Sequence, residues 1–440
     1  MEKITVVGNR FNKRLFGTAL ARQALSYSEQ DTVWVADIIQ GIGMNAVRFS
    51  RQDEVIDLDR WYWMLKHFKE RGVYWVVPLR TVHKKGDIER FTSQSRIKSE
   101  KARIDALYGS INPYTKMTLG EDPALALVDI ANEASVWLEL YPGQVAWDSM
   151  SNTAKRGLVA TVRAIEEDFM GQLGEHMKNH TDAIQVGSQT NYEMQGAALD
   201  AQDTHLYINR PNPARLPAKF DNRRVLDDRA LWPCTMAYDR LPDKPMGCSE
   251  FNDSGPSWFY GSNLLTIGAV AALQDWSFLL HHHMGDYTVA VKDMIPGELL
   301  DATHLGKIEI LKLIKTMFLD HEIAPVEPVG FESPDYYEDV AKYGVISGTS
   351  ILMKKGSIDY WRPLKGSRQV SADFGEPLRI NTASLNITAY NTVTYGDKPH
   401  RTIGRCENRD MVWDDRSDDV NSPPKRYSSW GKGPVWLEVL

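Results

Sequence analysis

Short apolar segments alternate with longer amphipathic segments along the first three quarters of the chain. From about residue 15 to about residue 325, apolar runs of strand length are followed by stretches whose apolar residues recur at helical spacing. The first unit runs from Leu15 to Leu20, continues through a helix-like segment over 32–43, and reaches a second apolar run at 44–50. Continuous apolar runs are typical of parallel strands that helices cover. The pattern therefore predicts a series of βα units.

Eight apolar runs have the length expected of strands. They are residues 15–20, 44–50, 73–79, 124–133, 182–189, 203–208, 244–250 and 275–283. Helical spacing is found over residues 32–43, 57–72, 157–179, 262–274 and 305–319. The helix over 57–72 ends on Gly72, and glycine is favoured at helix C-caps. Eight strands that alternate with helices predict an α/β protein with a (β/α)8 TIM barrel.

The composition changes near Tyr337. Gly, Ser, Thr and Asn become frequent there, and period-two segments such as residues 378–390 (LRINTASLNITAY) appear. We therefore expect a catalytic barrel over residues 1–335 and a small C-terminal all-β domain, β-sandwich-like, over residues 336–440. Bracing of the barrel is its expected role, and polysaccharide binding is the alternative.

Composition and charge narrow the class of protein. The 440 residues are 42% hydrophobic and 25% charged, which is typical of folded globular proteins. A net charge of −7 argues against a nucleic-acid partner, since such binding depends on clustered Lys and Arg. The three cysteines show no CxxC spacing, so they indicate neither a metal site nor a disulfide framework.

The sequence leaves the cellular location of the protein undetermined. No run of 18 or more apolar residues is found, so we expect no membrane span. The N-terminal segment also lacks an apolar run of signal-peptide length. The location is therefore unknown: extracellular or periplasmic if an export signal was removed, and cytoplasmic otherwise.

Two acidic residues end predicted strands. Asn132 and Glu133 end the run over 124–133, and Glu250 ends the run over 244–250. The carboxyl ends of barrel strands meet at one mouth, so both glutamates are candidates for chemistry. Either one alone could be a salt-bridge or rim residue. Together they are what glycosidic hydrolysis requires, because one carboxyl group protonates the leaving oxygen while the other attacks or activates water.

The order of the motifs and the residues within them resemble those of the cellulase-like members of clan A of the glycoside hydrolases. The resemblance rests on residues 57–79, 112–135, 244–252 and 271–278, and it covers roughly residues 15–325. It implies that Glu133 is the acid/base and Glu250 the nucleophile of a retaining enzyme that needs no cofactor. The partner would be a carbohydrate substrate, and the protein a monomer or small homo-oligomer.

The same resemblance implies roles for other residues. Arg48 would steady the nucleophile, and Asn132 would bind the 2-hydroxyl group of the sugar. His205 and Tyr207 match a His-x-Tyr pattern in which the tyrosine contacts the nucleophile, and Trp276 would form the floor of a sugar subsite. Arg80 stands where many clan members have a histidine. Each of these could instead be structural, as an ion pair, a strand cap or a core residue.

Aromatic residues near the expected mouth are candidates for sugar stacking, because indole and phenol rings pack against sugar rings. Trp137 and Trp258 are the two that we assign to substrate binding. The run His281–His283 invites a metal site, but alternate strand residues face opposite sides and no fourth ligand is evident. No metal is therefore expected, and His281 or His283 should line the mouth.

Several functions remain compatible with the sequence. The first is an endo-β-glycanase, such as a β-glucanase or a β-mannanase. An exo-acting β-glycosidase of the β-galactosidase kind and an inactive sugar-binding barrel are alternatives. An aldolase or a metal-dependent hydrolase would need a strand-end lysine or clustered His and Asp ligands, and neither is found.

Overall fold

The protein is described from a computed structural model. The described residues are 1–20, 28–49, 58–79, 88–134, 136, 150–187, 198–208, 224–227, 244–253, 259–284, 305–325, 369–371, 377–389, 393–395 and 398–399. Three predicted binding residues, Arg80, Trp137 and Trp258, lie outside these ranges. Their assignment stays a prediction.

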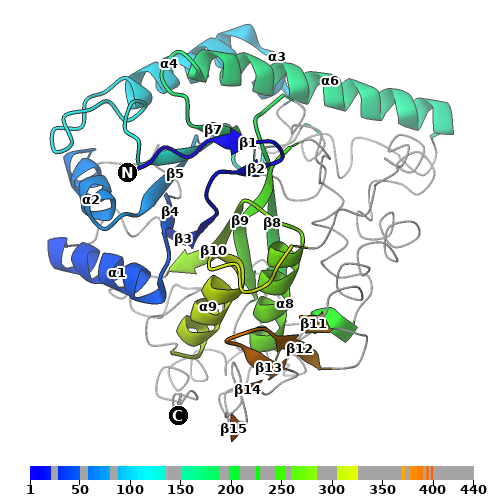
Figure 1. Ribbon diagram of the computed structural model, residues 1–440. Coiled ribbons are helices and arrows are strands. Elements are labelled where there is room, and N and C mark those ends of the chain that lie inside the picture. Colours follow the sequence, from blue (N-terminus) through cyan, green and yellow to red (C-terminus); the bar gives the residue numbers. More distant parts are fainter. Residues whose placement is uncertain are drawn as a thin grey trace, which may run out of the picture.

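Eight parallel strands form the centre of the molecule (Figure 1). They are β3 (Leu15–Leu20), β4 (Ala46–Phe49), β5 (Tyr74–Pro78), β6 (Leu125–Asp129), β7 (Ile184–Val186), β8 (Gln202–Ile208), β9 (Met246–Asp253) and β10 (Phe278–Met284). Their order is β7-β6-β5-β4-β3-β10-β9-β8. Between the two edge strands, the backbone N–H groups of Asp200 and Ala201 donate to the Gln185 carbonyl at 3.0 and 3.2 Å. The strands thus make a nearly closed barrel, and the predicted α/β barrel is confirmed.

Helices surround the strands on the outside (Figure 1). They are α1 (Glu29–Ile42), α2 (Leu58–Glu70), α3 (Glu89–Thr92), α4 (Gln94–Tyr108), α6 (Asn152–Met177), α8 (Tyr260–Leu273) and α9 (Leu305–Phe318), with a 3-10 turn at Val225–Asp227. Helices α3 and α4 were not among the helices predicted from the sequence. Gly72 follows α2 with φ +74, the left-handed conformation that the predicted cap requires.

The side chains of alternate strand residues point into two different apolar cores. Ala46 and Tyr74 point into the barrel, whereas Val47 and Trp75 pack beneath the helices. The inner core is closed at the amino ends of the strands by a hairpin of β1 (Val6–Val7) and β2 (Arg10–Phe11). There the Phe11 ring stacks on Phe278 with ring centroids 5.7 Å apart. The opposite, carboxyl end of the barrel is the end that carries the polar side chains.

A small antiparallel sheet follows the barrel in the chain. It consists of β11 (Val370–Ser371), β12 (Leu378–Asn381), β13 (Asn386–Ala389), β14 (Val393–Tyr395) and β15 (Lys398–Pro399) in sequence order. The predicted small all-β part is therefore confirmed, while the boundary at 335/336 falls outside the described residues.

The sheet is attached to the barrel. The Gln369 side chain accepts from the Ala324 N–H at 2.8 Å and donates to the Glu322 carbonyl at 2.9 Å. Leu378 and Ile380 belong to the same apolar core as the barrel helices. These contacts join the sheet to the barrel. None of the helices in the described part of the chain has both the length and the apolar character needed to cross a bilayer.

Candidate active site

Four barrel strands bring the predicted polar residues together at their carboxyl ends. Arg48 lies on β4, Asn132 and Glu133 follow β6, His205 and Tyr207 lie on β8, and Glu250 lies on β9. Parallel strands place their carboxyl ends at one mouth, which explains how residues 200 positions apart meet. The six side chains form one connected set of hydrogen bonds and ion pairs.

A β-bulge in β9 aims Glu250 into the barrel. Thr204 pairs with Cys248, and the next residue of β8, His205, pairs with Glu250, so Ser249 is an extra residue in β9. The pairing with β10 shifts at the same place. A bulge lets two neighbouring side chains reach the same side of a sheet. Both Ser249 and Glu250 accordingly contact inward residues of β8.

The Glu250 carboxylate is surrounded by donors and positive charge. Arg48 Nη1 lies 2.5 Å from Oε1, and the Tyr207 hydroxyl donates to Oε2. The rings of His205 and His282 lie 3.6 Å from Oε2. Burial opposes ionisation, but the charges of His205, His282 and Arg48 outweigh it and hold the pKa of Glu250 well below its ordinary value. Glu250 is therefore ionised at neutral pH, as a nucleophile must be.

Arg48 is buried among three oxygen acceptors. Besides Glu250, its Nη2 donates to Asp129 Oδ2 at 2.8 Å and to the amide oxygen of Asn132. Burial opposes the guanidinium charge, yet Glu250 and Asp129 raise the pKa of Arg48 above its ordinary value. A buried ion pair is stable only when further hydrogen bonds satisfy both partners. Arg48 therefore fixes three side chains in one geometry.

Glu133 differs from Glu250 in its setting. Its side chain is 31% exposed, whereas that of Glu250 is 8% exposed. Its backbone has φ +50, a left-handed conformation that is uncommon outside glycine and is concentrated at functional sites. The carboxyl group of Glu133 is therefore the one of the two that is open to solvent.

His205 connects the two glutamates to a buried carboxyl group. Its Nδ1 lies 2.9 Å from Glu133 Oε1, and its Nε2 lies 3.0 Å from Ser249 Oγ. Ser249 Oγ in turn donates to Asp203 Oδ2 at 2.6 Å. Burial alone would lower the pKa of His205, but Glu250, Glu133 and Asp203 raise it to about 9. Burial raises the pKa of Asp203 to about 7, although His205 opposes this shift. At neutral pH the imidazole is protonated and both ring nitrogens donate.

The two carboxyl groups are close together. One oxygen of Glu133 and one of Glu250 lie within 4.8 Å of each other and of a His205 ring nitrogen. Such a cluster has the spacing of a metal site, but the cationic His205 beside both carboxylates and the cationic Arg48 beside Glu250 disfavour a further cation. The arrangement pairs a buried, ionised carboxylate with a more exposed carboxyl group at the carboxyl ends of the strands.

Two predictions for this region need correction. Trp276 precedes β10 at its amino end, is fully buried, and donates its indole N–H to Gln274 at 2.9 Å. It therefore packs at the end of the barrel opposite Glu250 and cannot be the floor of a sugar subsite there. His282, rather than His281 or His283, approaches Glu250, while His281 bonds Asn252 at 3.1 Å. The register of β10 against β3 shifts after His281, so the side chains of His281, His282 and His283 do not simply alternate between the two faces of the sheet.

Sequence reasoning also missed four side chains of the site: Asp129, Asp203, Ser249 and His282. Asp129 ends the apolar run of β6, and Asp203 lies two residues before His205 on the same strand face, so both had a positional signal. Ser249 had none, because a bulge brings it inward.

No known family model matches this chain, and no curated protein matches it. Among solved structures, the chain is similar to an endo-1,4-β-mannanase from Rhizomucor miehei, with 13% identity over 73% of this chain and 98% of the other, at a TM-score of 0.51. It is also similar to an endo-β-1,4-mannanase from Thermotoga petrophila, with 11% identity over 71% of this chain and 78% of the other, at a TM-score of 0.51. The chain therefore has the (β/α)8-barrel fold of these two mannanases.

Proposed function

We propose that this protein is a retaining glycoside hydrolase that cleaves β-glycosidic bonds of a polysaccharide or oligosaccharide. The observation that carries the proposal is the closeness of Glu133 and Glu250, since one carboxylate oxygen of each lies within 4.8 Å of the other. Carboxyl groups about 5 to 5.5 Å apart are typical of retaining enzymes, whereas inverting enzymes leave about 6.5 to 9.5 Å for a water molecule. The short separation favours direct attack by one carboxylate.

In the first step, Glu250 attacks the anomeric carbon as the bond from that carbon to the leaving oxygen breaks. Glu133 gives its proton to the leaving oxygen, and a glycosyl ester on Glu250 is formed. In the second step, Glu133 takes a proton from water, whose oxygen attacks the anomeric carbon and releases Glu250. Two inversions restore the β configuration of the sugar.

The remaining side chains orient the pair. Arg48 and Tyr207 each bind one oxygen of Glu250, which keeps the nucleophile ionised and fixed. His205 binds Glu133 and holds positive charge between the two carboxyl groups. Since the amide oxygen of Asn132 accepts from Arg48, the amide nitrogen is the atom that would face a sugar hydroxyl.

For the substrate, we propose a β-1,4-linked glycan with endo cleavage, and β-mannan as the first to test. Two proteins of similar fold are endo-acting β-1,4-mannanases. Identity of 13% and 11% leaves room for another sugar, so β-glucans, xylans and galactans belong in the same panel.

The test is product analysis of the full chain on this panel, together with aryl β-glycosides. The wild-type protein should release sugar from at least one substrate, and proton NMR should show the β-anomer first. Glu250→Ala should have no turnover, whereas the control Glu89→Gln, at a residue whose side chain is 76% exposed, should match the wild type. Wild-type turnover in Glu250→Ala, or first release of the α-anomer, would overturn the proposal.

A further inference from the structure

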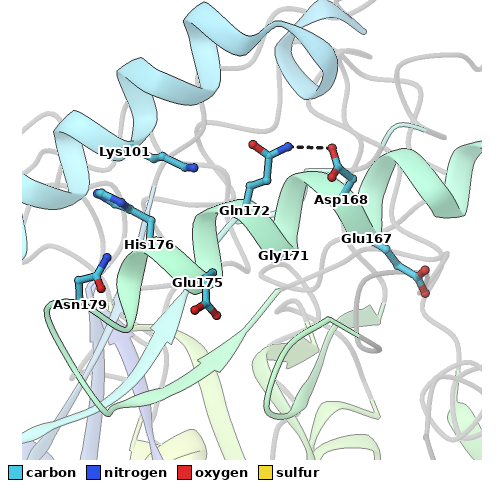
Figure 2. A pocket seen from close by; sticks show the side chains of 8 residues that line it. All are labelled: Lys101, Glu167, Asp168, Gly171, Gln172, Glu175, His176 and Asn179. Atoms are coloured by element: carbon cyan, nitrogen blue, oxygen red, sulfur yellow. Dashed lines mark hydrogen bonds between the residues drawn. The ribbon is translucent and has the colours of Figure 1, made fainter.

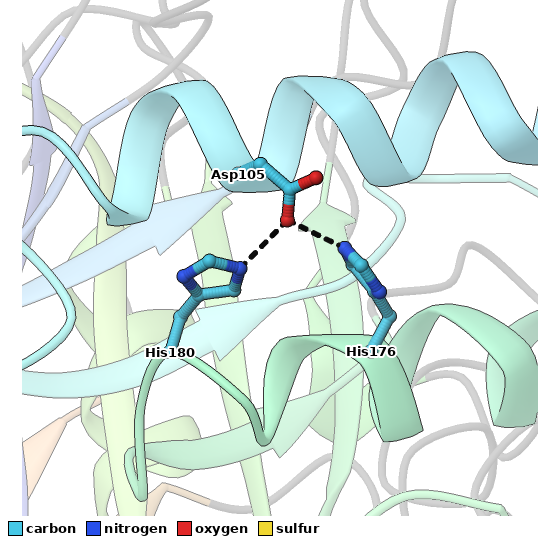
Figure 3. Close-up of side chains that lie close together, drawn as sticks. All are labelled: Asp105, His176 and His180. Atoms are coloured by element: carbon cyan, nitrogen blue, oxygen red, sulfur yellow. Dashed lines mark hydrogen bonds and ion pairs between the residues drawn. The ribbon is translucent and has the colours of Figure 1, made fainter.

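Two histidines and an aspartate meet on the outside of the barrel, on elements that carry neither Glu133 nor Glu250. Asp105 lies on α4, His176 lies in the last turn of α6, and His180 follows the end of that helix. His180 is held there by a backbone hydrogen bond from its N–H to the Met177 carbonyl, at 2.9 Å. Figure 3 shows the two imidazole rings converging on the same carboxylate from α6 and the turn after it.

Both ring nitrogens point at one oxygen atom. The Nε2 atoms of His176 and His180 each lie 2.7 Å from Asp105 Oδ1. The ring centroids are 5.8 Å apart and the rings are steeply inclined, at 61°. One ligand atom from each residue lies within 4.8 Å of the other two. Three donor atoms from three side chains thus surround one small volume.

These donors suit a divalent transition-metal ion. Imidazole nitrogen and carboxylate oxygen bind zinc at about 2.0 to 2.2 Å, with tetrahedral geometry preferred. Tetrahedral ligands at those distances lie about 3.4 Å apart, so Asp105 would withdraw from each nitrogen by only about 0.7 Å.

The cluster is open on one side. The side chains of Asp105, His176 and His180 are 52%, 23% and 20% exposed. Three protein ligands with an exposed side leave a fourth position for water. A site of this kind exchanges its ion with solvent, so binding can be measured directly.

The neighbouring surface is predominantly acidic. His176 also lines a groove of about 540 Å³ between α4 and α6, together with Glu167, Asp168, Glu175 and Lys101 (Figure 2). Three carboxylates and one ammonium group give this groove a net negative charge. A negative field raises the local concentration of cations.

We propose that Asp105, His176 and His180 form a binding site for a divalent transition-metal ion of the zinc class, independent of the glutamate pair. The bound ion would tie α4 to the C-terminal end of α6. Without an ion, the two hydrogen bonds to Asp105 make the same connection more weakly.

The experiment titrates tag-free, metal-free full-length protein with Co²⁺, followed by its visible absorption, and with Zn²⁺, followed by calorimetry. One equivalent should bind, and Zn²⁺ should raise the melting temperature. His176→Ala and Asp105→Ala should each weaken binding by at least about tenfold. The controls His321→Asn, at an exposed histidine after α9, and Glu250→Ala should bind like the wild type.

Each outcome decides the proposal. If the wild-type protein does not bind one equivalent of Co²⁺ or Zn²⁺, the proposal is overturned, whatever the variants do. Binding that persists in His176→Ala and Asp105→Ala, or that disappears in Glu250→Ala, places the ion elsewhere and also overturns it. Sugar release should be the same in His176→Ala and wild type, so the test stands apart from the proposed hydrolysis.

Discussion

The guanidinium group of Arg48 lies 2.5 Å from the carboxylate of Glu250, in a place where both side chains are at most 8% exposed. Replacement by methionine keeps much of the volume but leaves Glu250 and Asp129 without their buried counter-charge. We expect Arg48→Met to lower the free energy of unfolding by about 3 to 5 kcal/mol. The pKa of Glu250 should also rise, which moves the acid limb of the pH–activity profile toward neutral pH. Urea unfolding and kcat/KM against pH measure the two effects.

Arg71→Met is the matched control. Arg71 pairs with Asp37 at 2.8 Å, but that aspartate side chain is 57% exposed. Exposed ion pairs contribute about 0 to 1 kcal/mol, so stability and the pH profile should change little. Equal losses in the two variants would show that the Arg48 pair has no special importance.

The hydroxyl group of Tyr207 holds the second oxygen of Glu250. A hydrogen bond to a charged group contributes about 1.5 to 3 kcal/mol. If that contribution acts in the transition state, Tyr207→Phe should lower kcat by about tenfold to a hundredfold. Tyr114 is the control. Its hydroxyl group donates to Asp59 over 2.7 Å, and neither residue belongs to the site, so Tyr114→Phe should leave kcat unchanged. An unaltered kcat in Tyr207→Phe would contradict the assigned orientation of the nucleophile.

The pH dependence of stability follows from His205 and Asp203. The pKa of His205 is raised from 6.5 to about 9. Its contribution to the free energy of unfolding is therefore fully present below pH 6.5 and is lost as pH rises through about 9. The pKa of Asp203 is raised from 3.8 to about 7, so its contribution is lost in the same direction between those values. The unfolding free energy should therefore fall as pH rises from about 6.5 to about 9.

His205→Gln isolates the contribution of His205 between pH 6.5 and about pH 9. The difference in unfolding free energy between wild type and His205→Gln should shrink as pH rises through this range, as measured by urea titrations at each pH. His321→Asn is an opposite control, because partial desolvation and the charge of Arg14 lower the pKa of His321, although its side chain remains largely exposed. Its contribution should instead be lost as pH falls below 6.5. A difference curve for His205 that is flat or rises with pH would show that the buried imidazole is neutral.

Trp276 should affect stability and leave substrate binding unchanged. It is fully buried at the amino end of β10, where its indole group packs in the outer core. We expect Trp276→Phe to lower the free energy of unfolding by about 0.5 to 3 kcal/mol and to leave KM as in the wild type. A large rise in KM at unchanged stability would return Trp276 to the substrate site.

The apolar pattern along the chain was sufficient to predict the barrel. The run Leu15–Leu20 is a strand with the predicted bounds, and α9 begins at Leu305 as expected. Helix α4 has few apolar residues, with only Ile97, Ile104 and Tyr108 buried, so its sequence gave a weak amphipathic signal.

The site was predictable where one strand end provides one functional residue. Arg48, Glu133 and Glu250 follow that rule, and the structure brings all three together. Ser249 and His282 do not, because register shifts in β9 and β10 change which side chains face the barrel. Those shifts arise from pairing between strands far apart in sequence, which a single-sequence pattern does not contain.

Azide rescue of Glu133→Ala tests the paired roles of Glu133 and Glu250 most directly. With an aryl β-glycoside whose leaving group needs no proton, Glu250 can still form the glycosyl ester, but water lacks its base. Azide needs no base, so it should restore turnover and release the β-glycosyl azide, while Glu250→Ala should give no β-glycosyl azide. A Glu133→Ala protein that azide does not accelerate, or a β-glycosyl azide from Glu250→Ala, would contradict the account.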